Sequence, residues 1–252
     1  MAARHNRRRR RRGRFSFLYK LLSVVLIVCA IVAGSVIFFR VEEITVSGST
    51  VYSSDEIIAA SEVAVGDNLF LVGRPSTSKK ILEQLPYIRE VNVRAVLPST
   101  LAITVSECTV AGVVEGEDGS FWVLDTTGKL LEQGSSALKE QYPLISGITP
   151  ILPEVGMPIA VAVEQLSQLD SLKGLLAALE ERGMLGEMDD IDLSGPADIL
   201  MGFQGRFTVE IPLYDTDFSS SMNWLQAAAE YLGENQTGTI DLTLQPPRFI
   251  PN

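Results

Sequence analysis

The feature that most constrains this chain is an uncharged run of nineteen residues from Leu21 to Phe39. As a helix this run would span roughly 29 Å, which matches the hydrocarbon core of a bilayer. The residues before it include many basic side chains and no acidic one. Because positive charge beside a span holds that end in the cytoplasm, we expect a basic cytoplasmic tail (1–20), a signal anchor (21–39) and a far-side remainder. The residues expected to set this topology are Arg7, Arg8, Arg9, Arg10, Arg11, Arg12, Arg14 and Lys20.

Other interpretations of the apolar run fit less well. A cleaved signal peptide has a shorter apolar core followed by small residues, whereas Phe38, Phe39 and Arg40 follow here. A lipid-anchored Cys29 would need small residues before it, but Ile27 and Val28 are bulky. The arginine run also resembles a nucleic-acid patch. Beside a span, a topology signal that rests on anionic lipid is favoured.

Charge and composition restrict what the remainder can do. Ten of the 21 Lys and Arg residues lie in 1–40 and none of the 31 acids does, so 41–252 carries 11 basic and 31 acidic residues, a formal charge of −20. A region this acidic is not expected to bind nucleic acid. Cys29 lies in the span and Cys108 beyond it, so the two cannot pair. His5 is the sole histidine, which excludes Ser-His-Asp catalysis and histidine metal sites from 41–252.

Residues 41–108 predict a β-α-α-β-β unit. The strand 41–46 is followed by the capping-box pattern Ser53-x-x-Glu56, which predicts a short helix. A second helix is predicted from Pro75 to Leu85, before Pro86. Alternating aliphatic residues then predict two strands around the turn at 98–100. The unit should therefore be a three-stranded sheet with two helices on one face.

This ordered set resembles the POTRA domain of the bacterial division proteins FtsQ and DivIB. The resemblance is carried by Leu85-Pro86-Tyr87-Ile88, by Val91-x-Val93, and by Leu97-Pro98-Ser99-Thr100-Leu101-x-Ile103-x-Val105-x-Glu107. The earlier Val46-x-Gly48 and the segment 66–70 fit the same pattern. We therefore expect an α+β protein with a POTRA domain at 41–108.

A second domain is expected at 110–252, and it resembles the β domain of the same family, so that the likeness covers nearly the whole chain. A hairpin is predicted at 121–131, and a leucine stripe from Leu166 to Leu179 predicts a helix over 163–182 that ends before Gly183. Three short strands should follow between 191 and 211. A helix over 222–232, with Trp224 on its apolar side, and a closing strand at 239–244 complete the expected domain.

The acidic residues do not form a recognisable catalytic or metal site. Asp189, Asp190 and Asp192 lack the glycine and distal glutamate of an EF-hand loop, and are expected to be solvated at a strand entry. Glu115, Glu117 and Asp118 are expected in an exposed loop. The sequence indicates no cofactor, and we expect no enzymatic activity.

The resemblance implies a divisome scaffold at the septum that binds FtsL- and DivIC/FtsB-like coiled-coil membrane proteins and helps regulate the septal peptidoglycan synthase. In the family, the partner adds to the sheet edge near the last strand. The residues expected to form this edge are Thr239, Ile240, Asp241, Leu242, Thr243 and Leu244. An unpaired edge offers N–H and C=O groups to an incoming strand. A core role for this strand is the alternative.

Two other functions remain open from the sequence. An anchored POTRA protein could serve as an envelope or secretion chaperone, although no β-barrel segment follows the domain. An anchored wall hydrolase is the enzymatic alternative, which turnover of peptidoglycan would establish.

Overall fold

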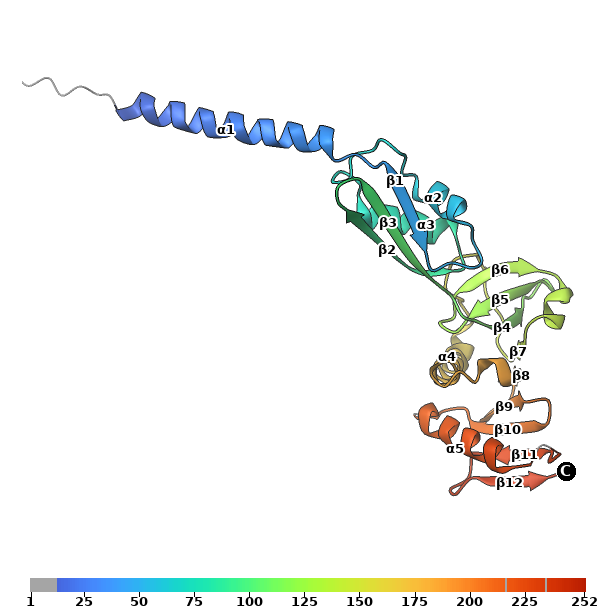
Figure 1. Cartoon of the computed structure of the whole chain (residues 1–252). Coiled ribbons are helices and arrows are strands. Elements are labelled where there is room, and N and C mark those ends of the chain that lie inside the picture. The colour runs from blue at the N-terminus through green and yellow to red at the C-terminus, as the bar shows by residue number, and fades with distance from the viewer. Residues whose placement is uncertain (1–12, 216, 234) are drawn as a thin grey trace, which may run out of the picture.

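Figure 1 shows the computed structural model, which describes residues 13–215, 217–233 and 235–252, with the backbone alone described at 13–16, 33 and 35–37. Helix α1 (Gly13–Phe38) leads into two successive β-sheets. Taken over the described residues, no helix is both long enough and apolar enough to cross a membrane. Of the predicted topology residues, Arg7 to Arg12 lie outside the described residues, and Arg14 and Lys20 belong to α1.

The first sheet has the strand order β1-β3-β2, with β1 parallel and β2 antiparallel to the central β3. Helices α2 and α3 supply Ile57 and Ile81 to a buried core that also contains Leu101 and Ile103. The predicted β-α-α-β-β order is confirmed. Its elements are β1 (Glu43–Ser47), α2 (Ser54–Ser61), α3 (Arg74–Gln84), β2 (Ile88–Val96) and β3 (Thr100–Glu107).

Local signals explain where these two helices begin and end. Ser53 accepts a hydrogen bond from the Glu56 amide at 3.3 Å, and the Glu56 carboxylate accepts one from the Ser53 amide at 2.8 Å, which completes the predicted capping box. Helix α3 begins at Arg74, one residue before Pro75, because proline suits the first turn of a helix. It ends at Gln84, since Pro86 disfavours helical geometry at the preceding residue.

The second sheet contains nine strands in the order β12-β11-β10-β9-β8-β7-β4-β5-β6. It begins at Val110, three residues after the first sheet ends. The strands are β4 (Val110–Glu115), β5 (Phe121–Asp125), β6 (Leu130–Gly134), β7 (Leu144–Ser146), β8 (Met188–Asp192), β9 (Asp198–Phe203), β10 (Phe207–Pro212), β11 (Gly238–Asp241) and β12 (Arg248–Pro251). The helical segments are η1 (Ser136–Glu140), η2 (Val163–Gln165), α4 (Leu166–Glu181), η3 (Leu185–Glu187) and α5 (Phe218–Tyr231).

Helices α4 and α5 lie on one face of the second sheet (Figure 1), where the main core forms. From Leu169 to Leu179 the leucine stripe of α4 faces this core, whereas Leu166, the first residue of the predicted stripe, is 47% exposed. On the opposite face, the outward side chains of β8 to β10 are mostly polar and at least partly exposed, as in β10, where Thr208 is exposed between buried Phe207 and Val209. Because helices cover only one face of this sheet, apolar and polar residues alternate along these strands.

Two helix starts differ from the sequence prediction. The predicted helix from Val163 begins with the 3₁₀ turn η2, so α4 starts at Leu166; it is followed by Gly183 in the left-handed region, φ 67°, as predicted. Helix α5 starts four residues earlier than predicted, because Asp217 caps it by accepting a hydrogen bond from the Ser220 amide at 3.1 Å. The serines at 219–221 concealed this turn, since serine is a poor helix former.

Candidate partner-binding edge

The predicted edge strand at 239–244 is not an edge, which corrects the sequence interpretation. Strand β11 covers only Gly238–Asp241 and lies between β10, to which it is parallel, and β12, to which it is antiparallel. Ile240 and Leu242 are buried in the core, whereas Leu244 is half exposed. The pairing between β11 and β12 ends at Asp241 and Arg248. Pro246 and Pro247, which carry no amide hydrogen, lie in the turn that leads back into β12.

Strand β12 is therefore the edge, and it was missed by the sequence analysis. It pairs Ile250 with Thr239 and Phe249 with Ile240. The Asn252 amide donates to the Thr237 carbonyl at 3.1 Å. Because alternate residues of an antiparallel strand point the same way, the backbone groups of Ile250 also face β11, and those of Phe249 face outward.

The opposite edge of the same sheet is covered by the chain itself. The Leu130 amide of β6 donates to the Met157 carbonyl at 2.9 Å, and the Gly156 amide donates to the Leu130 carbonyl at 2.7 Å. The 3₁₀ helix η1 adds Leu138 to a small core with Phe121 and Leu131. The β6 edge is covered in this way at Leu130, whereas no segment of the described chain pairs with the outer side of β12.

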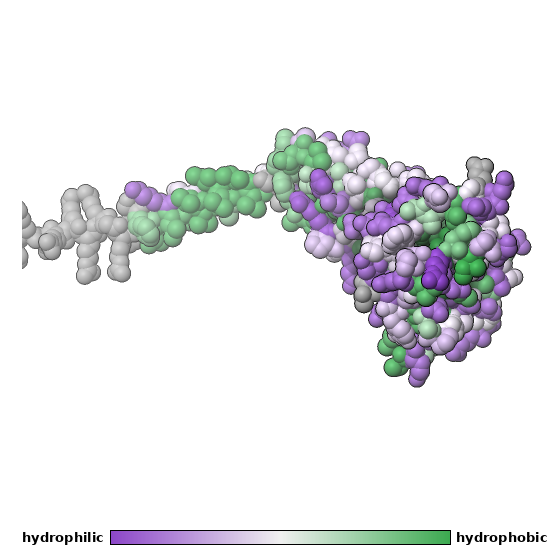
Figure 2. Space-filling model, turned by 90° about the horizontal axis from the view of Figure 1, so that it is seen from below, coloured by the Kyte–Doolittle hydropathy of each residue, from purple (hydrophilic) through white to green (hydrophobic). Residues whose placement is uncertain are grey.

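An apolar groove of about 550 Å³ lies between α5 and the end of the sheet. Trp224, Ala227, Ala228 and Tyr231 form one wall at the spacing of a single helix face. Ile240, Leu242, Pro247 and Phe249 belong to the sheet side. Figure 2, seen from below, shows hydrophobic residues gathered at this end of the molecule between hydrophilic ones.

Trp224 lies on the apolar side of α5, as the sequence predicts, but in the groove rather than in the core. Its side chain is 57% exposed, whereas Met222 and Leu225 of the same helix are fully buried. With 3.6 residues per turn, Met222 and Leu225 point into the core, and Trp224 lies at the margin of that face. Tyr231, also in the groove, is 90% exposed. A second hollow of about 570 Å³ shares Trp224 with the groove and extends to Leu244 and Asp215.

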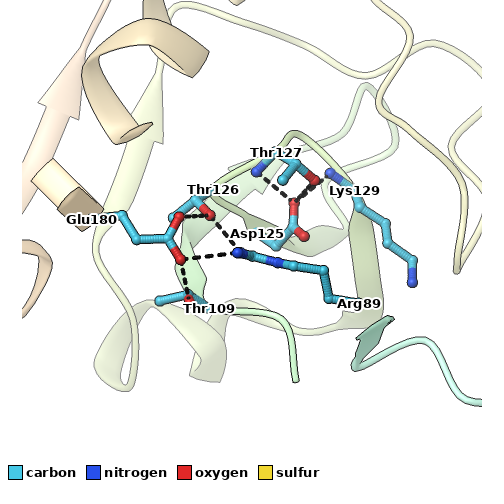
Figure 3. A network of polar contacts seen from close by, with 7 residues as sticks. All are labelled: Arg89, Thr109, Asp125, Thr126, Thr127, Lys129 and Glu180. Carbon is cyan, nitrogen blue, oxygen red and sulfur yellow. Dashed lines mark hydrogen bonds and ion pairs between the residues drawn. The ribbon is translucent and has the colours of Figure 1, made fainter. Parts of the chain in front are cut away.

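A network of polar contacts joins the first sheet to the second (Figure 3). Arg89 of β2 donates to Glu180 of α4 at 3.1 Å and to the Thr126 hydroxyl at 2.8 Å. The hydroxyls of Thr109 and Thr126 each donate to the Glu180 carboxylate at 2.6 Å. Burial acts to raise the pKa of Glu180, but the hydrogen bonds from Thr109, Thr126 and Arg89 outweigh it and lower the pKa.

Lys129 extends the same junction. The Asp125 carboxylate orders the turn before it by accepting from the Thr127 and Lys129 amides at 2.9 and 2.8 Å. The Lys129 ammonium group then donates to the carbonyls of Pro86 and Ile88 at 2.7 and 3.1 Å. These bonds tie the second sheet to the first, and no sequence signal pointed to them.

Cys108 lies at this junction, where its amide donates to the Tyr87 carbonyl at 2.7 Å. Burial, together with the nearby Asp125 carboxylate, raises the pKa of its thiol to about 11, so the thiol stays protonated at neutral pH. Cys108 therefore acts as a half-buried apolar residue of the junction.

The acidic residues considered as metal ligands have local roles. Asp189 accepts from the Gly205 amide at 2.6 Å, and Asp192 accepts from the Ser194 amide at 2.8 Å. Burial, and then the charges of Asp189 and Asp192, raise the pKa of Asp190. In the part of the chain that is described, no group of three or more His, Cys, Asp or Glu side chains is placed to hold a metal ion.

Comparisons with known proteins agree with this architecture. Residues 39–107 match the model of the POTRA domain, FtsQ-type. The chain is 28% identical over 169 residues to cell division protein FtsQ of Corynebacterium glutamicum, covering 66% of this chain and 75% of the relative. It is 26% identical over 249 residues to cell division protein DivIB of Brevibacillus brevis, covering 97% and 87%. A further FtsQ, from Geobacter sp., is 36% identical over 110 residues, covering 44% and 39%. On these matches, residues 39–107 form a POTRA domain of the FtsQ type, and the chain is similar to the bacterial cell division proteins FtsQ and DivIB.

Proposed function

We propose that this chain is a membrane-anchored, non-catalytic scaffold of the cell-division machinery. The relatives are named as cell division proteins. The observation that carries the proposal is the uncovered edge strand β12 beside the apolar groove of α5. Such an arrangement suits a partner chain better than a small substrate, because a strand edge supplies backbone hydrogen bonds and the groove supplies a pocket for side chains.

The proposed binding mode is addition of a partner strand to β12. The partner would pair with the outward backbone groups of Phe249 and with the Pro251 carbonyl. Prolines at 247 and 251 shorten the edge on either side, which limits pairing with unrelated strands. An apolar side chain of the partner would enter the groove against Trp224. Leu242 and Leu244, from the originally predicted segment, would line the groove and its second hollow.

The partners proposed for this edge are FtsL- and DivIC/FtsB-like coiled-coil membrane proteins, through which the chain would help regulate septal peptidoglycan synthesis. The membrane anchor would be the uncharged run 21–39, with the basic tail in the cytoplasm. The backbone of this region is helical over Gly13–Phe38. Residues 41–252 would then work outside the cytoplasm, at the division septum.

The test is a pull-down of the tagged full-length chain from gently solubilised membranes, with partners identified by mass spectrometry. We expect two small single-span coiled-coil proteins and a septal synthase. Recovery of secretion components instead would favour a chaperone and contradict the proposal. Turnover of peptidoglycan by the purified chain would contradict the non-catalytic assignment.

A further inference from the structure

A set of exposed apolar side chains surrounds the point where α1 enters the first sheet. Two loops contribute: the one between α2 and α3, with Leu71 73% exposed, and the β2–β3 turn, with Leu97 59% exposed. Figure 1 shows both loops at the end of the first sheet that meets α1, and Figure 2 shows hydrophobic residues continuing from α1 onto that end. We call this set the apolar tip; it consists of Phe38, Val65, Phe70, Leu71, Val96 and Leu97, all about half exposed or more.

The first loop is fixed directly to the end of α1. The Leu69 amide donates to the Phe39 carbonyl at 2.9 Å, and the Val41 amide donates to the Asp67 carbonyl at 2.8 Å. The Phe39 ring also meets the Phe70 ring edge-on, with centroids 5.0 Å apart. The loop therefore keeps one position relative to the last turn of α1.

The second loop is fixed in the same way. The Glu42 amide donates to the Ser99 carbonyl at 2.8 Å, and the Ser99 hydroxyl donates to the Glu42 carboxylate at 2.8 Å. A shallow hollow beside Phe38 and Gly34 of α1 is lined by Pro98 of this turn. Leu97 directly precedes Pro98 in this turn, and it is 59% exposed.

We infer that the apolar tip inserts into the interfacial layer of the same bilayer that α1 crosses. This inference rests on the proposed anchor: α1 ends at Phe38, and the two loops are bonded within four residues of that end. Side chains held there lie at the depth of the boundary between headgroups and acyl chains. Exposure of apolar side chains to water is unfavourable, and insertion into that layer removes them from water.

Charge at the tip favours apolar insertion over attraction to anionic lipid. Arg40 and Arg74 lie beside it, but so do Glu42 and Asp67, and all four are exposed. Glu43, whose amide donates to the Ser99 carbonyl at 3.4 Å, adds a third exposed carboxylate, so these groups give no excess of positive charge and contact should not require anionic lipid. Insertion would fix the tilt of the first sheet against the membrane, and with it the direction in which the β12 edge points.

Depth-dependent fluorescence quenching tests this inference on the full chain in phosphatidylcholine vesicles. An NBD fluorophore is attached to a single cysteine, introduced as Leu71→Cys or Leu97→Cys after Cys29→Ser and Cys108→Ser. Lipids that carry a nitroxide near the headgroup should lower its emission about twofold if the side chain enters the interface. The matched control is Val163→Cys in η2, which is 79% exposed but lies outside the first sheet and its loops, and its emission should stay unchanged.

A label on the native Cys29, in a Cys108→Ser chain, reports the anchor independently. Quenching of Cys29 by deep nitroxides without quenching at Leu71 and Leu97 would keep the anchor and overturn the tip insertion. Absence of quenching at Cys29 would overturn the anchor and, with it, this inference. Quenching at all three positions, with Val163 unaffected, supports both.

Discussion

The junction between the two sheets is built from charged and hydroxyl side chains, whereas the free edge of the second sheet is built from apolar side chains and outward backbone groups. At the junction, Arg89, Glu180 and Thr126 are joined by hydrogen bonds of 2.6 to 3.1 Å. At the edge, Trp224 and Tyr231 leave large aromatic surfaces uncovered beside a strand with outward backbone groups.

The difference shows which surface has its partner within the chain. Directional bonds between charged and hydroxyl groups fix one geometry, so the junction sets the angle between the sheets. Apolar side chains and an open strand edge give little stability by themselves, and gain it when another chain covers them. Variants in the two regions should therefore separate stability from partner binding.

The largest effect on binding is expected from Trp224→Ala in the groove. A central aromatic anchor typically contributes 2 kcal/mol or more, so partner affinity should fall about 30-fold or more. The free energy of unfolding should change by less than about 0.5 kcal/mol, because the side chain is more than half exposed. Titration of the purified partner onto vesicles holding the full chain measures the affinity.

Val163→Ala is the matched control, since Val163 is exposed and apolar but lies outside the groove. It should leave affinity unchanged. Full affinity in Trp224→Ala would show that the groove is not part of the partner site.

The next effect is expected at the junction, from Arg89→Met. The variant removes two charge-assisted hydrogen bonds while keeping the length of the side chain. Both side chains of the ion pair are 30% exposed, so the loss in stability should be about 1–2 kcal/mol rather than that of a fully buried pair. Urea unfolding followed by the fluorescence of Trp122 and Trp224 measures it as a lower midpoint at unchanged slope.

Arg94→Met, on the same strand but exposed, should change stability by less than about 0.5 kcal/mol. Partner affinity should be unaffected by Arg89→Met. A drop in affinity would mean that the junction takes part in partner binding, and would contradict the division into a junction that stabilises the fold and an edge that binds the partner.

Leu244→Glu should have a smaller effect. Leu244 lines the second hollow, at its rim, and is half exposed. A carboxylate placed there should lower partner affinity about tenfold without lowering the unfolding midpoint, because rim contacts contribute less than central ones. Circular dichroism melting and the same titration separate the two quantities. Loss of the cooperative melt would show that Leu244 belongs to the core.

The sequence predicts structure well where the determining contacts join residues that are close in the chain, and poorly where they join distant ones. The capping box at Ser53 and Glu56 acts within four residues, and the first sheet was readable throughout. Strand β12 has only four residues and follows two prolines. It becomes a strand by pairing with β11, so no local pattern in the sequence predicts it. Arg89 and Glu180 are 91 residues apart, and their contact depends on how the two sheets meet.

The smallest effect concerns pH and the first sheet near the junction. Glu107 ends β3, and its carboxylate accepts from Ser49 at 2.6 Å and from the Thr50 and Val51 amides at 2.7 Å. Burial acts to raise its pKa, but these hydrogen bonds prevail and lower it to about 2. A carboxylate with a lowered folded-state pKa adds stability above its unfolded pKa of about 4.5, and loses it as the pH falls toward 2.

Glu107→Gln should therefore lower the melting temperature by about 2–4 °C at pH 6, and the difference from the unmodified chain should vanish near pH 2. Melting of both chains across this range by circular dichroism checks the prediction. Trp224→Ala changes apolar contacts in the groove and no titratable group. Its small effect on the melting temperature should therefore stay constant with pH. A pH-independent difference for Glu107→Gln would mean that the bonds to 49–51 act as neutral contacts, and that charge does not strengthen this end of the molecule.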